Sequence, residues 1–307
     1  MPPIRLMKPA TVECTEAALS KLRYPLLASP KLDGIRAATP NGVPQSNSGK
    51  PFPNRALMEL LSKPVFANLD GELILGDPCA HGVLHRTQSV VMSEDAPIDG
   101  LNFFVFDQIG NSNPYHMRYP YVNCLHPQLF ALEQTKLDSP LAVIGYTEIQ
   151  LAVGYEGVIL RDPAGRYKNG RSTLREGGML RIKPREDTEA VIVGWDWLEI
   201  NDNAPELSEL GFTRRSSAKS GKIQTNLVGS VRMRDPRWPK EFGATVADHD
   251  MRGYLAELGD EMIGKLGKFS YMPYGSMEAP RQTSFIGLRD PIDLDRPRPS
   301  LDFLERN

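Results

Sequence analysis

The sequence has 307 residues, more than a single hydrophobic core usually supports, so we expect two domains. Its hydrophobic fraction of 40% and charged fraction of 24% are those of an ordinary globular protein. The net charge of −2 excludes a uniformly basic surface, so any nucleic-acid-binding surface must be a local patch that acid balances elsewhere.

The cysteines and histidines indicate neither a zinc ribbon nor a disulfide framework. Cys14, Cys79 and Cys124 lie far apart, and none belongs to a CxxC pair. His81 and His85 lie four residues apart, but no third ligand is evident. No run of about 18 apolar residues predicts a membrane span, and the N-terminal MPPIRLMKPA lacks the apolar core of a signal peptide. We therefore expect an intracellular, cytoplasmic protein with no membrane partner.

The first part of the chain mixes helical and strand patterns. In chain order, we predict a short helix at 57–66 that stops near Pro64, strands at 69–75 and 101–109, helices at 124–138 and 146–153, and strands at 156–161 and 177–184. The strand at 101–109 is apolar enough to be buried.

The character of the sequence changes after the charged stretch PREDT at 184–188, which we interpret as a linker. From Glu189 onward, short β-rich runs with turns between them predict a small barrel such as an OB-fold. These runs are EAVIVGW, LVGSVRM, FGATV and GKFSYM. A long polar insertion, roughly 199–225, separates the first two of them.

Five short charged motifs lie at or beside the apolar strands of the first part. In order, they are Lys31-x-Asp33-Gly34-x-Arg36, Asp70-Gly71-Glu72, Phe106-Asp107, Glu156-Gly157 and Arg181-x-Lys183. Each alone has an ordinary structural interpretation, such as the turn that Asp-Gly favours. Carboxylates and cations at strand ends, rather than along helix faces, instead indicate the lining of a cleft.

The order and spacing of the five motifs resemble the covalent nucleotidyltransferase superfamily, specifically the small ATP-dependent DNA ligases of viral and bacteriophage type. The nearest resemblance is to the minimal ligases of algal viruses, and it covers residues from about 4 to 294. It includes the stretches GRYKNGRSTLREGGMLRIK (165–183), GFTRRSSAKSGKI (211–223) and FIGLRD (285–290).

The resemblance implies an α+β fold with two domains. A nucleotidyltransferase (adenylation) domain, with antiparallel sheets and flanking helices, is expected at 1–188. A β-barrel OB-fold domain is expected at 189–307, with a DNA-binding latch insertion at about 199–225.

The resemblance also implies a three-step reaction on nicked duplex DNA, carried out by a monomer with ATP as co-substrate. Lys31 attacks the α-phosphate of ATP, the AMP passes to the 5′-phosphate at a nick, and the 3′-hydroxyl then displaces the AMP. A free lysine, with a pKa of about 10.4, is almost wholly protonated at pH 7. Lys31 therefore needs a cationic neighbourhood, which Lys183, Arg181 and a bound Mg²⁺ (or Mn²⁺) are expected to supply.

The other motif residues are expected to bind the nucleotide. Arg36 offers a planar donor fork for ribose or phosphate oxygens, and Glu72 is suited to accept from a ribose hydroxyl. Asp70 and Glu72 alternate along one strand and are expected to point to the same face. Phe106 is expected to stack on adenine, although a core phenylalanine is the alternative. The expected nucleotide-binding set is Asp33, Arg36, Asp70, Glu72, Phe106 and Glu156, with Glu156 and Asp70 as metal ligands.

One departure from the family pattern concerns the 5′-phosphate of the nick. Asn47 stands where the family often has an arginine that helps to hold this phosphate. Lys50, Arg55 or Arg171 is expected to replace it.

Two further departures concern the last motifs. Arg181 stands where the family usually has a lysine, which keeps the charge but removes a proton donor or acceptor. The C-terminal motif is assigned either to Asp293 or to Asp295-Arg296. Arg281 is a firmer candidate for a DNA or nucleotide contact.

The predicted insertion is basic in its second half. Residues 211–225 contain Arg214, Arg215, Lys219 and Lys222 and no acidic residue, as phosphate contacts require. We expect a latch that is loose without DNA and orders across a groove. A solvated disordered loop is the alternative.

Three alternatives to a DNA ligase remain open. An RNA ligase and an mRNA capping-type guanylyltransferase belong to the same superfamily, and a non-catalytic DNA-binding clamp is a different class. The intact Lys31, Glu72, Glu156 and Lys183 argue against the clamp. A labelling assay with ATP and GTP would separate capping from ligation.

Overall fold

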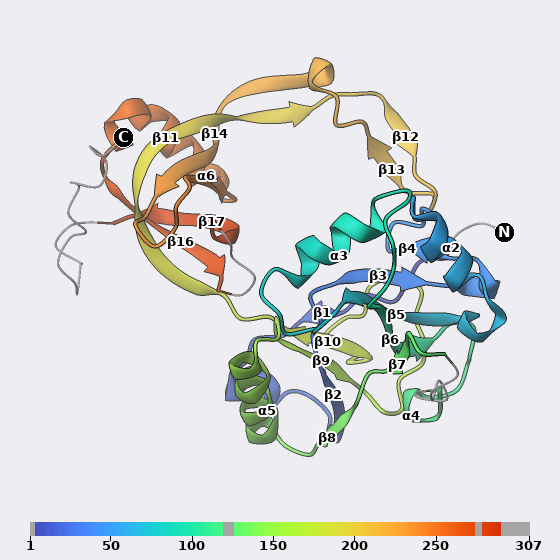
Figure 1. The fold of residues 1–307 in the computed structure, drawn as a ribbon. Coiled ribbons are helices and arrows are strands. Elements are labelled where there is room, and N and C mark those ends of the chain that lie inside the picture. The colour runs from blue at the N-terminus through green and yellow to red at the C-terminus, as the bar shows by residue number, and fades with distance from the viewer. Residues whose placement is uncertain (1–3, 119–125, 274–277, 290–307) are drawn as a thin grey trace. The chain divides into compact units, whose positions relative to one another are not determined.

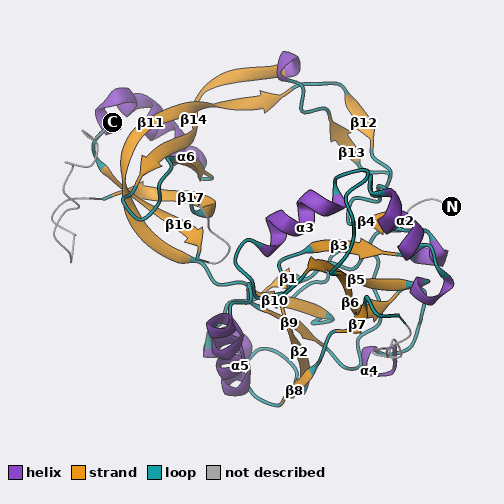
Figure 2. Ribbon diagram, in the orientation of Figure 1, coloured by secondary structure: helices purple, strands orange, loops and turns teal. Residues whose placement is uncertain are grey.

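The computed structural model describes residues 4–118, 126–273 and 278–289. The chain divides into two compact units (Figure 1). Unit 1 comprises Met1–Pro184 together with Leu207–Phe212, and unit 2 comprises Arg185–Glu206 with Thr213–Asn307. Helices and several sheets occur together in the chain (Figure 2), so the predicted α+β class is confirmed.

The first sheet of unit 1 has five strands in the order β1-β10-β9-β2-β8. They are β1 (Ala10–Thr11), β2 (Leu26–Pro30), β8 (Thr135–Leu137), β9 (Val158–Arg161) and β10 (Met179–Ile182). Helices α1 (Glu16–Leu19) and α5 (Pro140–Val153) share its hydrophobic core, which includes Leu19, Val143 and Leu160.

The second sheet of unit 1 has the order β4-β3-β5-β6-β7. Its strands are β3 (Ile35–Ala38), β4 (Gln45–Ser46), β5 (Leu69–Leu75), β6 (Leu101–Gln108) and β7 (Leu129–Ala131). Its core includes Leu57 and Leu61 of α2 (Arg55–Leu61), Val91 of α3 (Val83–Val91) and Phe103 of β6. Helix α4 (Tyr115–Arg118) follows β6 in the chain.

The two sheets differ from the prediction in that they are not purely antiparallel. Each contains one parallel pair, β1 with β10 in the first sheet and β6 with β7 in the second. In both cases a short strand at the edge of the sheet forms the parallel pair.

Strand β6 follows the prediction and explains how one strand serves both core and site. Its side chains alternate between buried and half-buried positions. Phe103 and Val105 on one face join the core, whereas Phe104 and Phe106 on the other face stay partly exposed. This period-2 pattern is what an extended backbone imposes.

Unit 2 is built on five strands paired in the order β11-β14-β15-β17-β16, and β16 also pairs with β11. They are β11 (Glu186–Asn201), β14 (Lys222–Arg234), β15 (Phe242–Val246), β16 (Leu266–Met272) and β17 (Arg281–Leu288). Their apolar side chains, among them Ile192, Met233 and Phe269, form a core that Leu255 of α6 (His249–Leu258) joins.

The predicted insertion at 199–225 is more ordered than expected. β11 and β14 stay paired out to Asn201 and Lys222. Between them, β12 (Pro205–Leu207) and β13 (Thr213–Arg215) form a two-stranded sheet. Short 3-10 turns complete the elements of the chain at Pro40–Gly42, Pro64–Phe66, Lys219–Gly221 and Gly259–Met262.

Most predicted elements of unit 1 lie where expected, but the helix at 124–138 is wrong. Residues 124 and 125 lie outside the described residues, and the rest of the segment contains β7 and β8 instead. The backbone around β7 hydrogen-bonds to β6, where Phe103 N–H donates to the Gln128 carbonyl. β8 pairs instead with β2 of the other sheet. Pairing with two sheet edges therefore decides the conformation of a segment whose apolar residues fit either pattern.

Among the helices of the described ranges, none combines the length and apolar character that a membrane crossing requires.

The backbone is tightly packed at Gly157, which directly precedes β9 and lies where β2 and β10 end. Gly157 has φ of 151°, and a Cβ atom there would lie 2.1 Å from the carbonyl oxygen of Ile182. Its own carbonyl accepts a hydrogen bond from the Lys31 N–H at 2.8 Å. A side chain at this position would therefore separate β9 from β10 and displace Lys31.

We expect Gly157→Ala to destabilise unit 1 by more than about 2 kcal/mol, because the added methyl group meets backbone that cannot move freely. All three tryptophans, Trp195, Trp197 and Trp238, lie in unit 2, so urea unfolding followed by tryptophan fluorescence reports that unit. Far-UV circular dichroism reports both. The variant should shift the dichroism transition and leave the fluorescence transition in place.

The matched control is Gly145→Ala in helix α5, where a Cβ would meet nothing within 4 Å. Alanine has a higher helix propensity than glycine, so this variant should be at least as stable as the parent. Equal stability of Gly157→Ala and the parent would contradict the role given to Gly157.

Candidate active site

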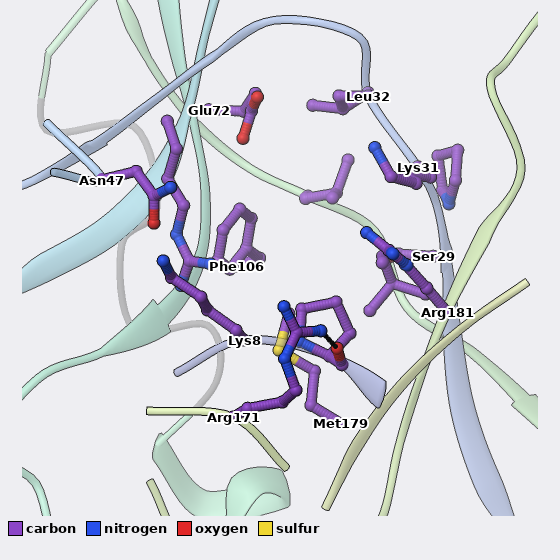
Figure 3. A pocket seen from close by; sticks show the side chains of 15 residues that line it. Lys8, Ser29, Lys31, Leu32, Asn47, Glu72, Phe106, Arg171, Met179 and Arg181 are labelled. Atoms are coloured by element: carbon purple, nitrogen blue, oxygen red, sulfur yellow. Dashed lines mark hydrogen bonds between the residues drawn. The ribbon is translucent and has the colours of Figure 1, made fainter. Parts of the chain in front are cut away.

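A pocket of about 350 Å³ lies in unit 1 and is lined by residues from both of its sheets (Figure 3). Its wall contains many more cations than carboxylates, which suits a polyanionic ligand. The positively charged lining residues are Lys8, Lys31, Arg36, Arg171 and Arg181, and the negatively charged one is Glu72.

Strand register brings three charged residues together at one edge of the pocket. Pro30 of β2 and Ile182 of β10 both pair with Val158 of β9. Lys31 and Lys183 directly follow the first two residues, and Glu156 precedes Val158 by two positions. The antiparallel order β10-β9-β2 therefore delivers the three side chains to the same place.

Glu156 forms ion pairs with both lysines at once. Its Oε2 accepts from Lys31 Nζ and its Oε1 contacts Lys183 Nζ. Burial, with only 4% of the residue exposed, would by itself raise the pKa of Glu156. The two lysines outweigh burial and hold the pKa of Glu156 below its ordinary value.

The pKa of Lys183 is lowered, first by burial and then by the positive charges of Lys31 and Arg181, against the opposing effect of Glu156. Lys183 therefore loses its proton more easily than a free lysine. Arg181 lines the pocket and donates to Thr11 Oγ1 at 3.0 Å. The predicted cations of the last motif thus lie beside Lys31.

Arg36 is fixed by a fully buried carboxylate. Its Nε and Nη2 donate to the two oxygens of Asp70 at 2.9 and 2.7 Å. Asp70 raises the pKa of Arg36 although burial would lower it. Tyr167 also donates to Asp70 Oδ2, at 2.7 Å. Both oxygens of Asp70 are thus engaged, which does not fit the metal-ligand role predicted for it.

Glu72 and Phe106 both line the pocket, from β5 and β6. Burial raises the pKa of Glu72 to about 7, and the nearby Lys31 and Arg36 only partly offset it. Arg36 lies over the ring of Phe106, 5.2 Å from its centroid. Phe106 therefore lines the pocket and also packs against the apolar cluster that contains Ile74.

Asp33 and Asp107 of the same motifs lie elsewhere. Asp33 lies in the turn between β2 and β3, outside the pocket wall. Asp107 points to the buried face of β6, where it pairs with Arg118 and Arg161. Within the described residues, no group of three or more His, Cys, Asp and Glu side chains is arranged to hold a metal.

The pocket that Asn47 lines also contains a cation that sequence reasoning missed. Lys8 lines the pocket together with Arg171 (Figure 3). The two residues form a parallel β-bridge, and Arg171 is anchored by donating to the Pro9 carbonyl at 2.8 Å. Burial, then Arg36 and Arg171, lower the pKa of Lys8. No spacing rule marks Lys8, because only tertiary pairing brings the N-terminal segment to the pocket.

The other predicted replacements for the missing arginine lie outside the pocket wall. Lys50 lies 3.9 Å from Glu209, and Arg55 pairs on the exposed surface of α2 with Glu94 and Asp95. Of the three predicted residues, Arg171 alone lines the pocket.

The predicted DNA-binding cations of the insertion are exposed but mostly paired. Arg214 pairs with Glu206 and Lys222 with Glu199, whereas Arg215 donates to the Asn203 carbonyl. Lys219 begins an exposed 3-10 turn. Arg281 lies half-buried at the start of β17. The C-terminal candidates Asp293, Asp295 and Arg296 lie outside the described residues.

The raised pKa of Glu72 predicts a specific pH dependence of stability. The folded protein binds this proton more tightly than the unfolded chain, so the contribution of Glu72 is most favourable below the ordinary pKa of 4.5 and declines as the pH rises through about 7. Glu72→Gln should flatten the decline of unfolding free energy between about pH 5 and pH 8, by no more than about 3 kcal/mol.

Urea unfolding followed by far-UV circular dichroism across this pH range measures the effect. Glu59→Gln on the exposed face of α2 is the matched control and should keep the pH dependence of the parent. Identical pH profiles for Glu72→Gln and the parent would show that Glu72 does not titrate in this range.

Comparisons with known proteins give one consistent likeness. No family model matches the chain. DNA ligase B of Mycobacterium tuberculosis and a probable DNA ligase of Mycobacterium bovis are each 24% identical over 211 residues, or 64% of this chain. The chain spans about 40% of the length of these curated relatives.

Solved structures agree with the sequence matches. A Chlorella virus DNA ligase-adenylate structure is 26% identical, with a TM-score of 0.50, and the alignment covers 94% of this chain and 98% of that one. A Lig E DNA ligase structure has a TM-score of 0.68 at 20% identity, covering 93% of this chain and 99% of that one, and shows the shared fold. In sequence and in fold, the chain is therefore similar to DNA ligases.

Proposed function

We propose that this chain is an ATP-dependent DNA ligase that seals nicks with a 3′-hydroxyl and a 5′-phosphate in duplex DNA. The observation that carries the proposal is the position of Lys31, which faces a cation-lined pocket while Glu156 holds it next to Lys183. We assign unit 1 to adenylation and unit 2 to an OB-fold that binds DNA. The likeness to the Chlorella virus DNA ligase-adenylate supports this division.

In the first step, the Nζ of Lys31 attacks the α-phosphate of ATP, a nitrogen–phosphorus bond forms and pyrophosphate leaves. Lys31 must lose a proton before it can attack. Glu156 is the group in contact with that nitrogen and is therefore placed to accept the proton, while its other carboxylate oxygen contacts Lys183. Arg36 and Arg181 lie in the pocket wall and would offset the charge that develops on the phosphates.

Adenine binding is assigned to Phe106 and ribose binding to Glu72. Phe106 offers a partly exposed ring at the pocket wall. Glu72, with a pKa of about 7, is able to accept or donate a hydrogen bond to a ribose hydroxyl near neutral pH.

A divalent cation, Mg²⁺ or Mn²⁺, is expected to arrive with the nucleotide. The residues predicted to hold it fit poorly, since Arg36 and Tyr167 engage Asp70 and two lysines engage Glu156. The roles assigned to Lys31, Glu156 and Lys183 do not depend on the metal.

In the later steps, AMP passes to the 5′-phosphate of the nick, and the 3′-hydroxyl displaces it. We assign the 5′-phosphate to Lys8 and Arg171, which line the same pocket as Asn47. Asparagine carries no charge, so these two cations would supply the attraction that the family arginine provides elsewhere.

The insertion between β11 and β14 is proposed to contact the DNA backbone. Glu206 and Glu199 pair with Arg214 and Lys222 in the free protein. Surface ion pairs of this kind contribute little free energy, so DNA phosphates could displace the two carboxylates at low cost.

The first experiment tests the chemistry at Lys31. With ATP labelled at the α-phosphate, the protein should carry label through denaturing electrophoresis, and with ATP labelled at the γ-phosphate it should not. Lys31→Ala should abolish the labelling by removing the nucleophile. It should still seal a nick that already carries 5′-AMP, because that step needs no lysine nucleophile.

Labelling of the Lys31→Ala protein would overturn the assignment of the nucleophile. Labelling by GTP in preference to ATP would instead favour a capping-type enzyme.

The second experiment tests the proposed 5′-phosphate site. Lys8→Ala and Arg171→Ala should each slow AMP transfer to nicked DNA by about tenfold or more, because a charge-assisted contact is lost. Self-adenylation should change much less. Each variant should also flatten the salt dependence of nick binding by about one released ion.

Arg55→Ala is the matched control, since it removes an exposed cation that lies outside the pocket wall. It should transfer AMP at nearly the rate of the parent. A loss confined to Arg55→Ala would contradict the site proposed at Lys8 and Arg171.

A further inference from the structure

The hydroxyl of Tyr167 lies at a junction of buried hydrogen bonds behind the pocket. Its Oη donates to Asp70 Oδ2 at 2.7 Å and accepts from the Met7 N–H at 3.2 Å. Burial and the nearby Asp70 raise the pKa of Tyr167, so the hydroxyl keeps its proton near neutral pH. Tyr167 itself is not part of the pocket wall.

On one side, the hydroxyl acts on Arg36 through Asp70. Asp70 is fully buried and accepts the Nε and Nη2 donors of Arg36. A buried carboxylate with a third donor has its orientation fixed more tightly than one with two. The guanidinium of Arg36, which lines the pocket, is thereby held from behind.

On the other side, the hydroxyl acts on the segment that carries Lys8. Met7 is buried and directly precedes Lys8. The Lys8 backbone bonds to Gly170 and Ser172, on either side of Arg171. One hydroxyl therefore connects the support of Arg36 with the backbone that carries Lys8 and lies beside Arg171.

We propose that Tyr167 is a positioning residue whose hydroxyl holds Arg36 and Lys8 in register, so that the nucleotide and the 5′-phosphate meet a preformed set of cations. The proposal rests on the function proposed above. The ring of Tyr167 packs against Leu6, Ala38 and Ile109. Phenylalanine would keep this packing, so Tyr167→Phe isolates the hydroxyl.

The test measures ATP affinity without catalysis. Isothermal titration of ATP into the Lys31→Ala protein gives a dissociation constant for a chain that cannot form lysyl-AMP. Adding Tyr167→Phe should weaken ATP binding by about fivefold to tenfold, as expected when a hydrogen bond that orders a charged contact is lost. In the active protein, the same change should raise the KM for ATP more than it lowers kcat.

Tyr24→Phe provides the matched control, because it too removes a hydrogen-bonded tyrosine hydroxyl of unit 1. The Tyr24 hydroxyl donates to the Leu19 carbonyl at 3.2 Å. It should leave ATP affinity unchanged whatever it does to stability. Equal ATP affinity with and without Tyr167→Phe would overturn the proposal, even if the variant melts at a lower temperature.

A second variant separates positioning from general loosening. Asp70→Asn disrupts the next hydrogen bonds in the series from Tyr167 through Asp70 to Arg36. The effects of Asp70→Asn and Tyr167→Phe on ATP affinity should therefore be strongly non-additive in the double variant. Additive effects would show that Tyr167 acts by another route. If Tyr167→Phe does not fold, Asp70→Asn alone tests the proposal. Unchanged ATP affinity of Asp70→Asn would show that Tyr167 does not act on Arg36 through Asp70.

These measurements also distinguish the role of Tyr167 from the proposed function. If the parent protein, with Lys31 intact, binds ATP but forms no lysyl-AMP and seals no nick, the proposed ligase activity is overturned. The comparison of ATP affinities would still decide the role of Tyr167. Absence of ATP binding by the Lys31→Ala protein would overturn both.

Discussion

The site depends on one buried carboxylate that holds two lysines from different strands. Glu156 can be buried only because Lys31 and Lys183 compensate its charge, and removal of either lysine leaves the other with a changed partner. The arrangement in turn requires β9 to lie close against β2 and β10. This close approach is possible because Gly157 has no side chain. The packing of the backbone at Gly157 and the placement of Lys31 therefore depend on each other.

Three carboxylates in or near the pocket, Glu72, Glu156 and Asp70, lie in different environments. Two cations hold the pKa of Glu156 low, whereas burial raises the pKa of Glu72 to about 7. Asp70, fully buried, is committed to Arg36 and Tyr167. The three acidic residues thus differ in what they do: Glu156 pairs with Lys31 and Lys183, Glu72 titrates near neutral pH, and Asp70 supports an arginine. Environments that push pKa values apart in this way are typical of catalytic sites.

Much of this arrangement could be predicted, because strand patterns and strand ends are local properties. The apolar alternation in β5 and β6 was sufficient to locate those strands, and the motif around Lys31 could be assigned to a cleft. The sequence does not encode strand order directly, so the pairing of Lys8 with Arg171 could not be foreseen. The helix predicted at 124–138 was wrong for the same reason, since pairing of β7 with β6 and of β8 with β2 outweighs its helical pattern. The contacts of Asp70 with Arg36 and Tyr167 likewise join distant parts of the chain.

We propose that Lys31, rather than Lys183 on the other side of Glu156, is the nucleophile. Mass spectrometry of proteolytic peptides, taken after incubation of the parent protein with ATP, locates the attached AMP directly. We expect AMP on the peptide that contains Lys31 and no AMP on the peptide that contains Lys183. AMP attached to Lys183 or Lys8, with Lys31 unmodified, would contradict the assignment of Lys31 as the nucleophile.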